Sequence, residues 1–342
     1  MNVIKIVLLV NIIIKKEKDM AVNIYEVLKE TPYGAYGKFI GNTMHGINHE
    51  LRNPILKNIP EGDAYVFFTK PYFNMRAANL RGDRRTTNLI TTGVYNNVQT
   101  FIRQTLDPDL VFNGGSCDMV DRNSPWIPLL SNTLKSMSGW PDRVQPIFTS
   151  TPGARGEQYS MADGIIETNG RFDLTMQFEK MDGRINERLL ETWMLMTSLQ
   201  VDGKVWPYPW QEAYFEKNYD TSIYVLIMDS TNRLVIDIAR VISAFPINDN
   251  KGSGFNINNK KTDKPTEFSI RFECNIVEYS DPIDFYEFNL TTARWNLDIF
   301  NLIFNGNSGN LVKIPRNELS KHTSLIPYID TSTNELVWYG YK

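Results

Sequence analysis

Histidine and cysteine are the side chains here that most readily do chemistry, and they are few. His45 and His49 lie four residues apart with Glu50 beside them, a spacing that superficially matches two zinc ligands on one helical face. The metalloprotease pattern needs a glutamate directly after the first histidine, where it acts as the base, and Gly46 stands there instead. The sequence therefore predicts two loop histidines and no metal site.

Motifs for nucleophilic or nucleotide chemistry are also absent. His322 is alone in its region, and the chain has no Gly-x-Ser-x-Gly, no Gly-x-x-x-x-Gly-Lys-Ser/Thr and no Gly-x-Gly-x-x-Gly. Cys117 and Cys274 are far apart in dissimilar contexts, which predicts two buried free thiols. We therefore predict no catalytic, cofactor-binding or metal-binding residue. A carboxylate pair for glycoside hydrolysis stays open, because Asp and Glu number 39.

A basic cluster and an aromatic segment are the remaining candidates. The cluster contains an Arg-Gly-Asp triplet and consists of Arg76, Arg81, Arg84 and Arg85. It could hold a phosphate, but such charge runs more often form surface or intersubunit ion pairs, which we favour. The segment Trp206–Trp210, Trp-Pro-Tyr-Pro-Trp, could stack on sugar rings. We favour a rigid aromatic wedge that covers the end of the preceding helix, because aromatic side chains chiefly supply buried area.

The elements that must position these residues centre on Arg171–Phe245. Alternating Phe172, Leu174, Met176 and Phe178 predict a half-buried strand. An amphipathic helix follows, with Asp182 as its cap. The helix would bury Ile185, Leu189, Trp193 and Met196, and expose Arg184, Glu187, Arg188 and Glu191. Then Ile223–Met228 and Leu234–Ile238, around the polar loop Asp229–Arg233, predict a β-hairpin.

Weaker patterns lie before this block. We expect a short helix at Val22–Glu30, a strand at Ala64–Thr69, a helix with Val94, Val98, Phe101 and Ile102 inside, and a turn at Asp107–Pro108. Ser124–Asn132 combines two prolines with a large apolar anchor, Trp126. Pro146–Gly156 has loop composition, and we expect an irregular loop that marks a domain boundary and becomes ordered on a neighbour.

After the block, Asn248–Lys264 predicts an exposed loop. Alternating Phe268, Ile270, Phe272, Cys274 and Ile276 predict a long strand that ends near Tyr279, followed by a turn at Asp281–Pro282. The aromatic and Asn-rich tail is expected to finish as a hairpin around Ser332–Asn334. No internal repeat is present.

Composition limits the function classes. An aromatic fraction of 12% in alternating runs favours a β-rich fold, and a net charge of -3 gives no field that would attract nucleic acid or an anionic membrane. Met1–Ile14 is apolar but too short to span a bilayer. Residues 1–19 are either an apolar arm or an untranslated leader before a start at Met20, and both readings stay open.

The order of strand, amphipathic helix, Trp206–Pro207, hairpin, Ala244–Pro246 and long strand resembles the tube-type domain of contractile-tailed bacteriophages. Ala64–Pro71 and Ser124–Asn132 resemble segments of large-phage virion proteins. The resemblance implies an α+β, β-rich fold: a tail-tube-like β-sandwich or small barrel with a flanking amphipathic helix. We expect an N-terminal accessory region at 20–156, the tube-like domain at 157–290 and a C-terminal extension at 291–342.

The resemblance also implies a non-enzymatic virion protein, made in the bacterial host cytoplasm, that forms rings of the tail tube or of its junction with the baseplate. By analogy with the family, its partners would be copies of itself, six to a ring, and neighbouring tail proteins. DNA would only pass through the lumen, and no cofactor or stable membrane contact is implied. Two alternatives stay open: a wall-degrading enzyme that uses carboxylates, and a glycan-binding module that uses Trp206–Trp210.

Overall fold

A computed structural model of the chain describes residues 62–90, 97–110, 117–164, 169–214, 219–249, 251–252, 257–258, 261–262, 266–322 and 324–341. The chain divides into two compact units, each treated by itself below. One comprises Met1–Asp63 and Met228–Leu234, and the other comprises Ala64–Ile227 and Val235–Lys342. The expected helix at Val22–Glu30 and the residues His45, His49 and Glu50 lie outside the described residues.

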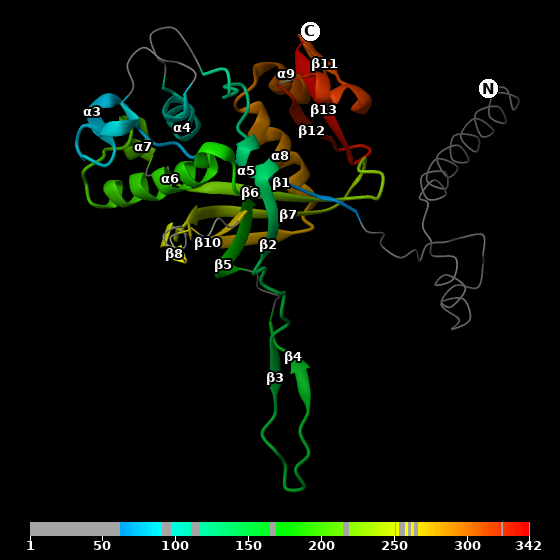
Figure 1. The fold of residues 1–342 in the computed structure, drawn as a ribbon. Helices are drawn as coiled ribbons and strands as arrows, with labels where there is room; N and C mark the ends of the chain where they lie inside the picture. Colours follow the sequence, from blue (N-terminus) through cyan, green and yellow to red (C-terminus); the bar gives the residue numbers. More distant parts are fainter. Residues whose placement is uncertain are drawn as a thin grey trace, which may run out of the picture. The chain divides into compact units, whose positions relative to one another are not determined.

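The larger unit is built on one curled antiparallel sheet, a half-barrel in section (Figure 1). Its strand order is β1-β6-β7-β10-β5-β2. The strands are β1 (Ala64–Phe68), β2 (Leu134–Ser138), β5 (Asn169–Glu179), β6 (Thr221–Met228), β7 (Val235–Pro246) and β10 (Glu267–Tyr279). The predicted α+β class, the strand at Ala64–Thr69, the β6–β7 hairpin and the long strand β10 are therefore confirmed, while the expected sandwich stays a prediction.

The pleat of β5 and β10 separates an apolar face from a polar one. Their facing residues on one side are all apolar: Phe268 with Phe178, Ile270 with Met176, Phe272 with Leu174, and Cys274 with Phe172. On the other side they are all polar: Glu267 with Glu179, Ser269 with Gln177, Arg271 with Thr175, and Glu273 with Asp173. Alternation in the sequence predicted this division, because successive residues of a strand point to opposite faces.

The alternation breaks at one point in β10. The register shifts between Cys274 and Ile276, as it does at a β-bulge. Beyond the shift Val277 is buried and Ile276 is only half-buried. The predicted strand therefore continues to Tyr279, but the bulge moves the buried position from Ile276 to Val277.

Helix α6 (Ile185–Val201) covers the apolar face (Figure 1). It buries Leu189, Leu190, Trp193, Met196 and Leu199 against residues of β5, β10 and β7. The predicted cap at Asp182 is wrong: Asp182 lies in the 3-10 turn η2 (Asp182–Arg184), and the N-cap is Arg184, in a left-handed conformation without a side-chain cap. Glu187, expected on the exposed side, is buried because it pairs with Lys180 and Arg184.

Helix α4 (Val98–Leu106) packs beside α6 and begins at Asn97, whose side chain accepts from Thr100 N at 2.7 Å. It confirms the expected helix, and the chain turns after Asp107 as predicted. Short elements complete this side of the unit: α3 (Ala77–Leu80), η1 (Thr87–Leu89), α5 (Pro128–Thr133) and α7 (Pro209–Tyr214). The predicted anchor Trp126, just before α5, is buried.

The C-terminal part adds a second layer over strands β1, β6 and β7. Helix α8 (Pro282–Ala293) places Phe288 against Phe67, Trp126 and Tyr224 with ring centroids 4.8–5.4 Å apart. Its N-cap is Asp281, whose carboxylate accepts from Ile283 N at 3.0 Å. The Asp-Pro pair was predicted to be a turn, but here it begins a helix, since proline also suits the first helical position.

Beyond α8 lie α9 (Leu297–Asn305), the 3-10 helix η4 (Arg316–Lys321) and a three-stranded sheet of order β11-β13-β12. The strands are β11 (Leu311–Lys313), β12 (Ile326–Asp330) and β13 (Glu335–Tyr341). Strands β12 and β13 confirm the predicted hairpin around Ser332–Asn334. Ala293, Ile299, Leu311 and Ile326 form a small core of their own.

Two further hairpins are short. Strands β3 (Ile147–Thr149) and β4 (Ser160–Ala162) pair antiparallel, so the prediction of an irregular loop is wrong for Ile147–Thr149. Strands β8 (Ile257–Asn258) and β9 (Lys261–Thr262) form a minimal pair within the expected loop Asn248–Lys264. The proposed division at residues 156–157 stays a prediction; β1 and β2, from before it, both belong to the main sheet.

In the smaller unit, the loop Met228–Leu234 is closed by Asp229. Its Oδ1 accepts from Arg233 N at 2.7 Å and Leu234 N at 3.0 Å, and its own amide donates to Leu234 O at 2.9 Å. Asn232 takes a left-handed conformation, with φ 56, and donates to Asp63 Oδ2 at 2.6 Å. These bonds explain why a polar loop connects β6 to β7, as the sequence predicted.

The two faces of β5 can be told apart by mutation. Leu174→Ala removes a fully buried side chain and is expected to lower the free energy of unfolding by about 2–5 kcal/mol. Asp173→Ala, on the exposed face of the same strand, should change it by no more than about 0.5 kcal/mol. Urea unfolding followed by tryptophan fluorescence measures both. Equal losses in the two variants would contradict the assignment of the faces.

Candidate functional site

Reactive side chains are not gathered in the described part of the chain. Among those residues, no group of three or more His, Cys, Asp or Glu is arranged to hold a metal ion. Cys117 and Cys274 are both buried and free, as predicted, and burial raises the pKa of the Cys274 thiol to about 12. A thiol with so high a pKa is a poor nucleophile. The helices of the described residues also include none with the length and apolarity of a membrane span.

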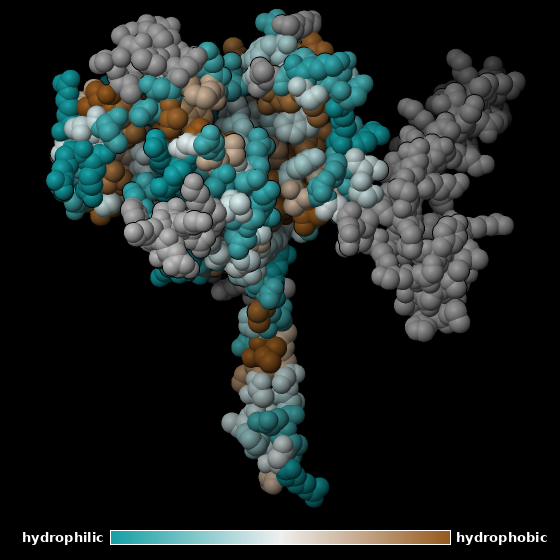
Figure 2. Space-filling view, viewed as in Figure 1, coloured by the Kyte–Doolittle hydropathy of each residue, from teal (hydrophilic) through white to brown (hydrophobic). Residues whose placement is uncertain are grey.

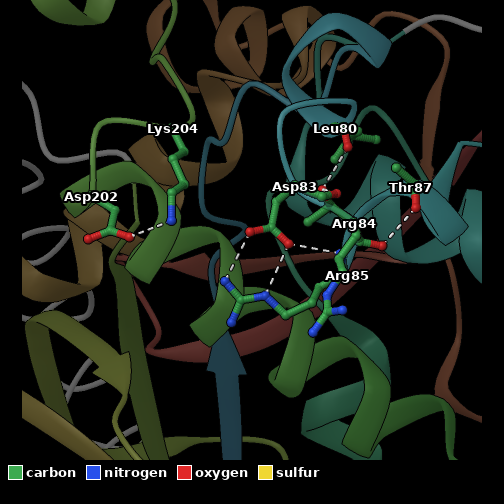
Figure 3. Close-up of polar contacts among 8 residues, drawn as sticks. Leu80, Asp83, Arg84, Arg85, Thr87, Asp202 and Lys204 are labelled. Carbon is green, nitrogen blue, oxygen red and sulfur yellow. Dashed lines mark hydrogen bonds and ion pairs between the residues drawn. The ribbon is translucent and has the colours of Figure 1, made fainter.

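The basic cluster around Arg81–Asp83 forms a local ion pair (Figure 3). Both side-chain nitrogens Nε and Nη2 of Arg85 lie 3.1 Å from the two oxygens of Asp83, and Arg85 N donates to Asp83 Oδ1 at 2.8 Å. These bonds lower the pKa of Asp83 to about 2. The favoured reading of surface ion pairs is therefore confirmed for Arg85. Within the described residues, Arg81 and Arg84 make no ion pair, so the structure does not bring the cluster together around one ligand.

The Arg81–Asp83 loop is held in shape by its neighbours. Thr86 Oγ1 donates to Leu80 O at 2.7 Å and to Asp83 O at 2.9 Å. A Cβ on Gly82 would lie only 3.1 Å from Asn79 O and 3.2 Å from Lys204 O, so glycine suits this close approach. In Figure 3, Lys204 pairs with Asp202, at 2.9 Å, beside the loop. The Arg-Gly-Asp triplet is thus a compact turn with its carboxylate already occupied.

The aromatic segment Trp206–Trp210 acts as a wedge through its middle residue. Tyr208 is buried, and its hydroxyl donates to the Asp107 carboxylate, with oxygen distances of 2.9 and 3.0 Å. Asp107 is the C-cap of α4, so the wedge contacts the end of α4 and not, as expected, the end of the preceding helix. Trp206 and Trp210 stay 65% and 40% exposed. The favoured wedge is therefore confirmed for Tyr208 alone.

Asp107 links three segments. It is fully buried and also accepts from Met75 N at 2.7 Å, while Arg103 Nη2 donates to Met75 O at 2.8 Å. Burial raises the pKa of Asp107 to about 6, against the opposing effect of the hydrogen bonds from Met75 and Tyr208. The carboxylate can be kept in the core because donors surround it. The arrangement holds the Met75 segment, α4 and the wedge together, and it presents no substrate pocket.

The polar face of the sheet lies opposite α6. It is rich in carboxylates, and its cations are largely paired: Lys135 Nζ lies 2.9 Å from Glu179 Oε2, and Arg171 Nη2 lies 3.0 Å from Glu273 Oε2. Helix α8 covers this polar side of the sheet over β1, β6 and β7 and reaches Glu278 near the end of β10. The described elements leave β2, β5 and most of β10 uncovered on this side. An antiparallel sheet can pack one face on the core and leave the other in water, so this polar face can be solvent-exposed.

The two edges of the sheet differ. At β1, Ile127 N donates to Phe68 O at 2.9 Å and Lys70 N to Pro125 O at 2.7 Å, so residues 125–127 occupy the outer side of the strand's end. At the other edge, β2 is paired only with β5 within the described residues. A strand with one unpaired side offers backbone donors and acceptors to another chain.

The β3–β4 hairpin is the most exposed described segment. It runs out from the sheet at the end of β2 and β5 (Figure 1), and it carries apolar patches on the part nearer the sheet (Figure 2). Those side chains are Val144, Ile147, Phe148, Tyr159 and Met161, with Ile147 65% exposed. Large apolar side chains on a projecting hairpin mark an interaction site. Residues 146–156 have the composition of a loop, and only the apolar pairs Ile147–Phe148 and Tyr159–Met161 could have indicated paired strands.

The bond between Tyr208 and Asp107 can be tested. Tyr208→Phe removes a donor to a buried carboxylate and is expected to lower the free energy of unfolding by about 1–3 kcal/mol at neutral pH. The donor favours ionised Asp107, so the loss should be larger at about pH 8 than at about pH 5. Tyr159→Phe, on the exposed hairpin, is the matched control. Unfolding curves at the two pH values give both numbers, and a pH-independent loss would argue against the bond.

Comparison with solved structures finds parts of contractile injection systems. The cap of the anti-feeding prophage (AFP tube terminating cap) is 13% identical with a TM-score of 0.27, over 45% of this chain and 81% of that one. A sheath-tube complex in the extended state, from an extracellular contractile injection system (PVC), has the same identity, TM-score and share of this chain, and 82% of its own. The sheath/tube terminator of the same system matches at 13% identity and TM-score 0.27 over 46% and 87%.

No curated protein matches the chain. A family model does, and it spans residues 10–342, far more than half of the sequence. Its description is "Putative phage tail tube protein". The match covers the main sheet, α6, the projecting hairpin and the C-terminal layer together. This chain belongs to the phage tail tube protein family.

Proposed function

We propose that the protein is a non-enzymatic building block that forms rings with copies of itself, in the tail tube or at its junction with the baseplate. The observation that carries the proposal is a half-barrel sheet with an unpaired edge at β2 and a polar face opposite α6. A ring of six copies follows the resemblance found in the sequence. The protein would act in the virion and be made in the host cytoplasm.

Ring closure would proceed through β2. Its free side can pair with a strand or loop of the neighbouring copy, which would continue the curled sheet from subunit to subunit. Because residues 125–127 already occupy the end of β1, the neighbour would meet a different set of groups there. Such a contact joins two unlike surfaces, and repetition of it around an axis closes a ring.

The polar face of β10, β5 and β2 would line the channel. Its cross-strand pairs include the carboxylates of Asp173, Glu179, Glu267 and Glu273. Lys135 and Arg171 are paired with two of them, and with Arg271 on the same face the lining would hold three cations against four carboxylates, so it would offer phosphates no net positive charge. DNA binding draws its strength from cations that neutralise phosphates. A lining of this kind would let DNA pass without retaining it.

The β3–β4 hairpin would join successive rings. It is exposed along both strands and carries apolar side chains that a single copy does not cover. Docked on an adjoining ring, these side chains would lose contact with water at about 25 cal/mol for each Å² buried. The sequence predicted that this segment becomes ordered on a neighbour, and the hairpin supplies a surface suited to that role.

The ring proposal predicts an assembly that can be seen directly. The purified full-length protein is expected to form closed rings or tubes in negative-stain electron microscopy. Sedimentation velocity should give a species several times the 39.4 kDa of one chain. A stable monomer at high protein concentration, with no rings on the grid, would refute the proposal.

The hairpin can be tested separately from ring closure. The double change Ile147→Asp and Phe148→Asp places charges on the exposed apolar patch and should leave rings intact while preventing their stacking. Loss of about 2 kcal/mol per contact would raise the protein concentration needed for tubes by about 30-fold. Val201→Asp, equally exposed at the end of α6, is the control. Tubes that form equally well in both variants would exclude the hairpin from stacking.

A further inference from the structure

A group of charged side chains fastens helix α8 to the sheet. Arg240 of β7 lies between Asp284 of α8 and Glu278 of β10: its Nη1 is 3.3 Å from Asp284 Oδ1 and 3.7 Å from Glu278 Oε2. The Asp284 side chain is fully buried. One turn further along α8, Glu287 Oε2 lies 3.9 Å from Arg240 Nη2 and 4.0 Å from Arg294 Nη2. Five side chains, from β7, β10 and α8 with its C-cap, therefore form one group around Arg240.

The charges in this group do not balance. Glu287 has a second cation in Arg294, but Asp284 and Glu278 share the single guanidinium of Arg240. The other titratable neighbour is Tyr224 of β6, whose ring lies 5.6 Å from the guanidinium and whose hydroxyl is bonded to Thr291 Oγ1 at 3.0 Å. With both carboxyls ionised, the group would hold an excess negative charge next to a buried residue, which is costly.

Two oxygen atoms mark where a proton would lie. Asp284 Oδ2 and Glu278 Oε2 are both buried, and neither has a hydrogen-bond donor. A buried carboxylate oxygen without a donor carries a full desolvation penalty. One proton held between the two carboxyls would make one of them a donor and the other its acceptor, and would cancel the excess charge.

We propose that Asp284 and Glu278 share one proton, and that this proton clamps α8, and with it the C-terminal layer, to strands β7 and β10. The clamp concerns the fold of a single copy and does not depend on the ring proposal. Burial, together with the neighbouring Glu278 carboxylate, raises the pKa of Asp284 to about 6, although Arg240 opposes the shift. A folded pKa above the ordinary value of 3.8 gives stability that is present at low pH and lost as the pH rises through about 6.

Asp284→Asn replaces the shared proton by a permanent amide donor. In the wild type, the pair should raise the unfolding equilibrium constant by about tenfold to a hundredfold between about pH 4 and about pH 7, since each unit of pKa shift corresponds to a factor of ten. In Asp284→Asn this rise should shrink by at least about tenfold. Asp107 contributes equally to both proteins, so the difference isolates the pair.

Glu267→Gln, exposed on the same strand as Glu278, is the matched control and should keep the wild-type pH dependence. A pH dependence in Asp284→Asn equal to that of the wild type would overturn the proposal. If Asp284→Asn does not fold, infrared difference spectra of the wild type provide the test. Asp107 contributes a protonated carboxyl band at about pH 5 to every variant, so the test is the difference between proteins. A band lost at about pH 8 that is larger by one carboxyl in the wild type than in Glu278→Gln supports the clamp, and equal bands in the two proteins refute it.

Discussion

The apolar contact between helix α6 and one face of the sheet is the interaction on which the rest of the structure depends. Trp193 is its centre: fully buried, it meets Phe272 edge-on at 6.3 Å and donates from Nε1 to Tyr219 O at 2.6 Å. Because successive strand residues point to opposite faces, committing one face to α6 leaves the other to polar residues. The surface assigned to the channel is thus the reverse side of the hydrophobic core.

The second layer determines how much of that reverse side is available. Phe288 of α8 packs on Phe67, Trp126 and Tyr224, which covers the sheet from β1 to β7. On the same side of the sheet, β10 and β5 carry mostly polar and charged side chains, and apart from Glu278 no described helix covers them. One sheet therefore serves as a core wall at one end and as a water-facing wall at the other, which agrees with the role of a tail tube protein.

The sequence correctly predicted the elements whose buried residues recur with the period of a strand or a helix. Leu174, Met176 and Phe178 in β5, and Leu189, Trp193 and Met196 in α6, follow the spacing of their elements. It failed where something other than a regular period decides the outcome: the bulge after Cys274, the pairing of Glu187 with Lys180 and Arg184, and the start of α8 at an Asp-Pro pair. The β3–β4 hairpin could not be predicted from a pattern of buried residues, because all residues of both strands are exposed. In the candidate site, the sequence predicted an ion pair in the arginine cluster and an aromatic wedge around Tyr208. The partner of Arg85, Asp83, is two residues away in the sequence. The partner of Tyr208, Asp107, is 101 residues away, and no local pattern could identify it.

The unequal edges of the sheet have a consequence for growth. Residues 125–127 occupy the end of β1, whereas the outer side of β2 is unpaired in the described part of the chain, so the two edges of one subunit cannot make the same contact. In the proposed ring, every interface would be head-to-tail: the β2 edge of one subunit would contact a different surface of the next, in the same order around the ring. A ring built in the proposed way would have a sense of rotation, and a stack of such rings would have two different ends.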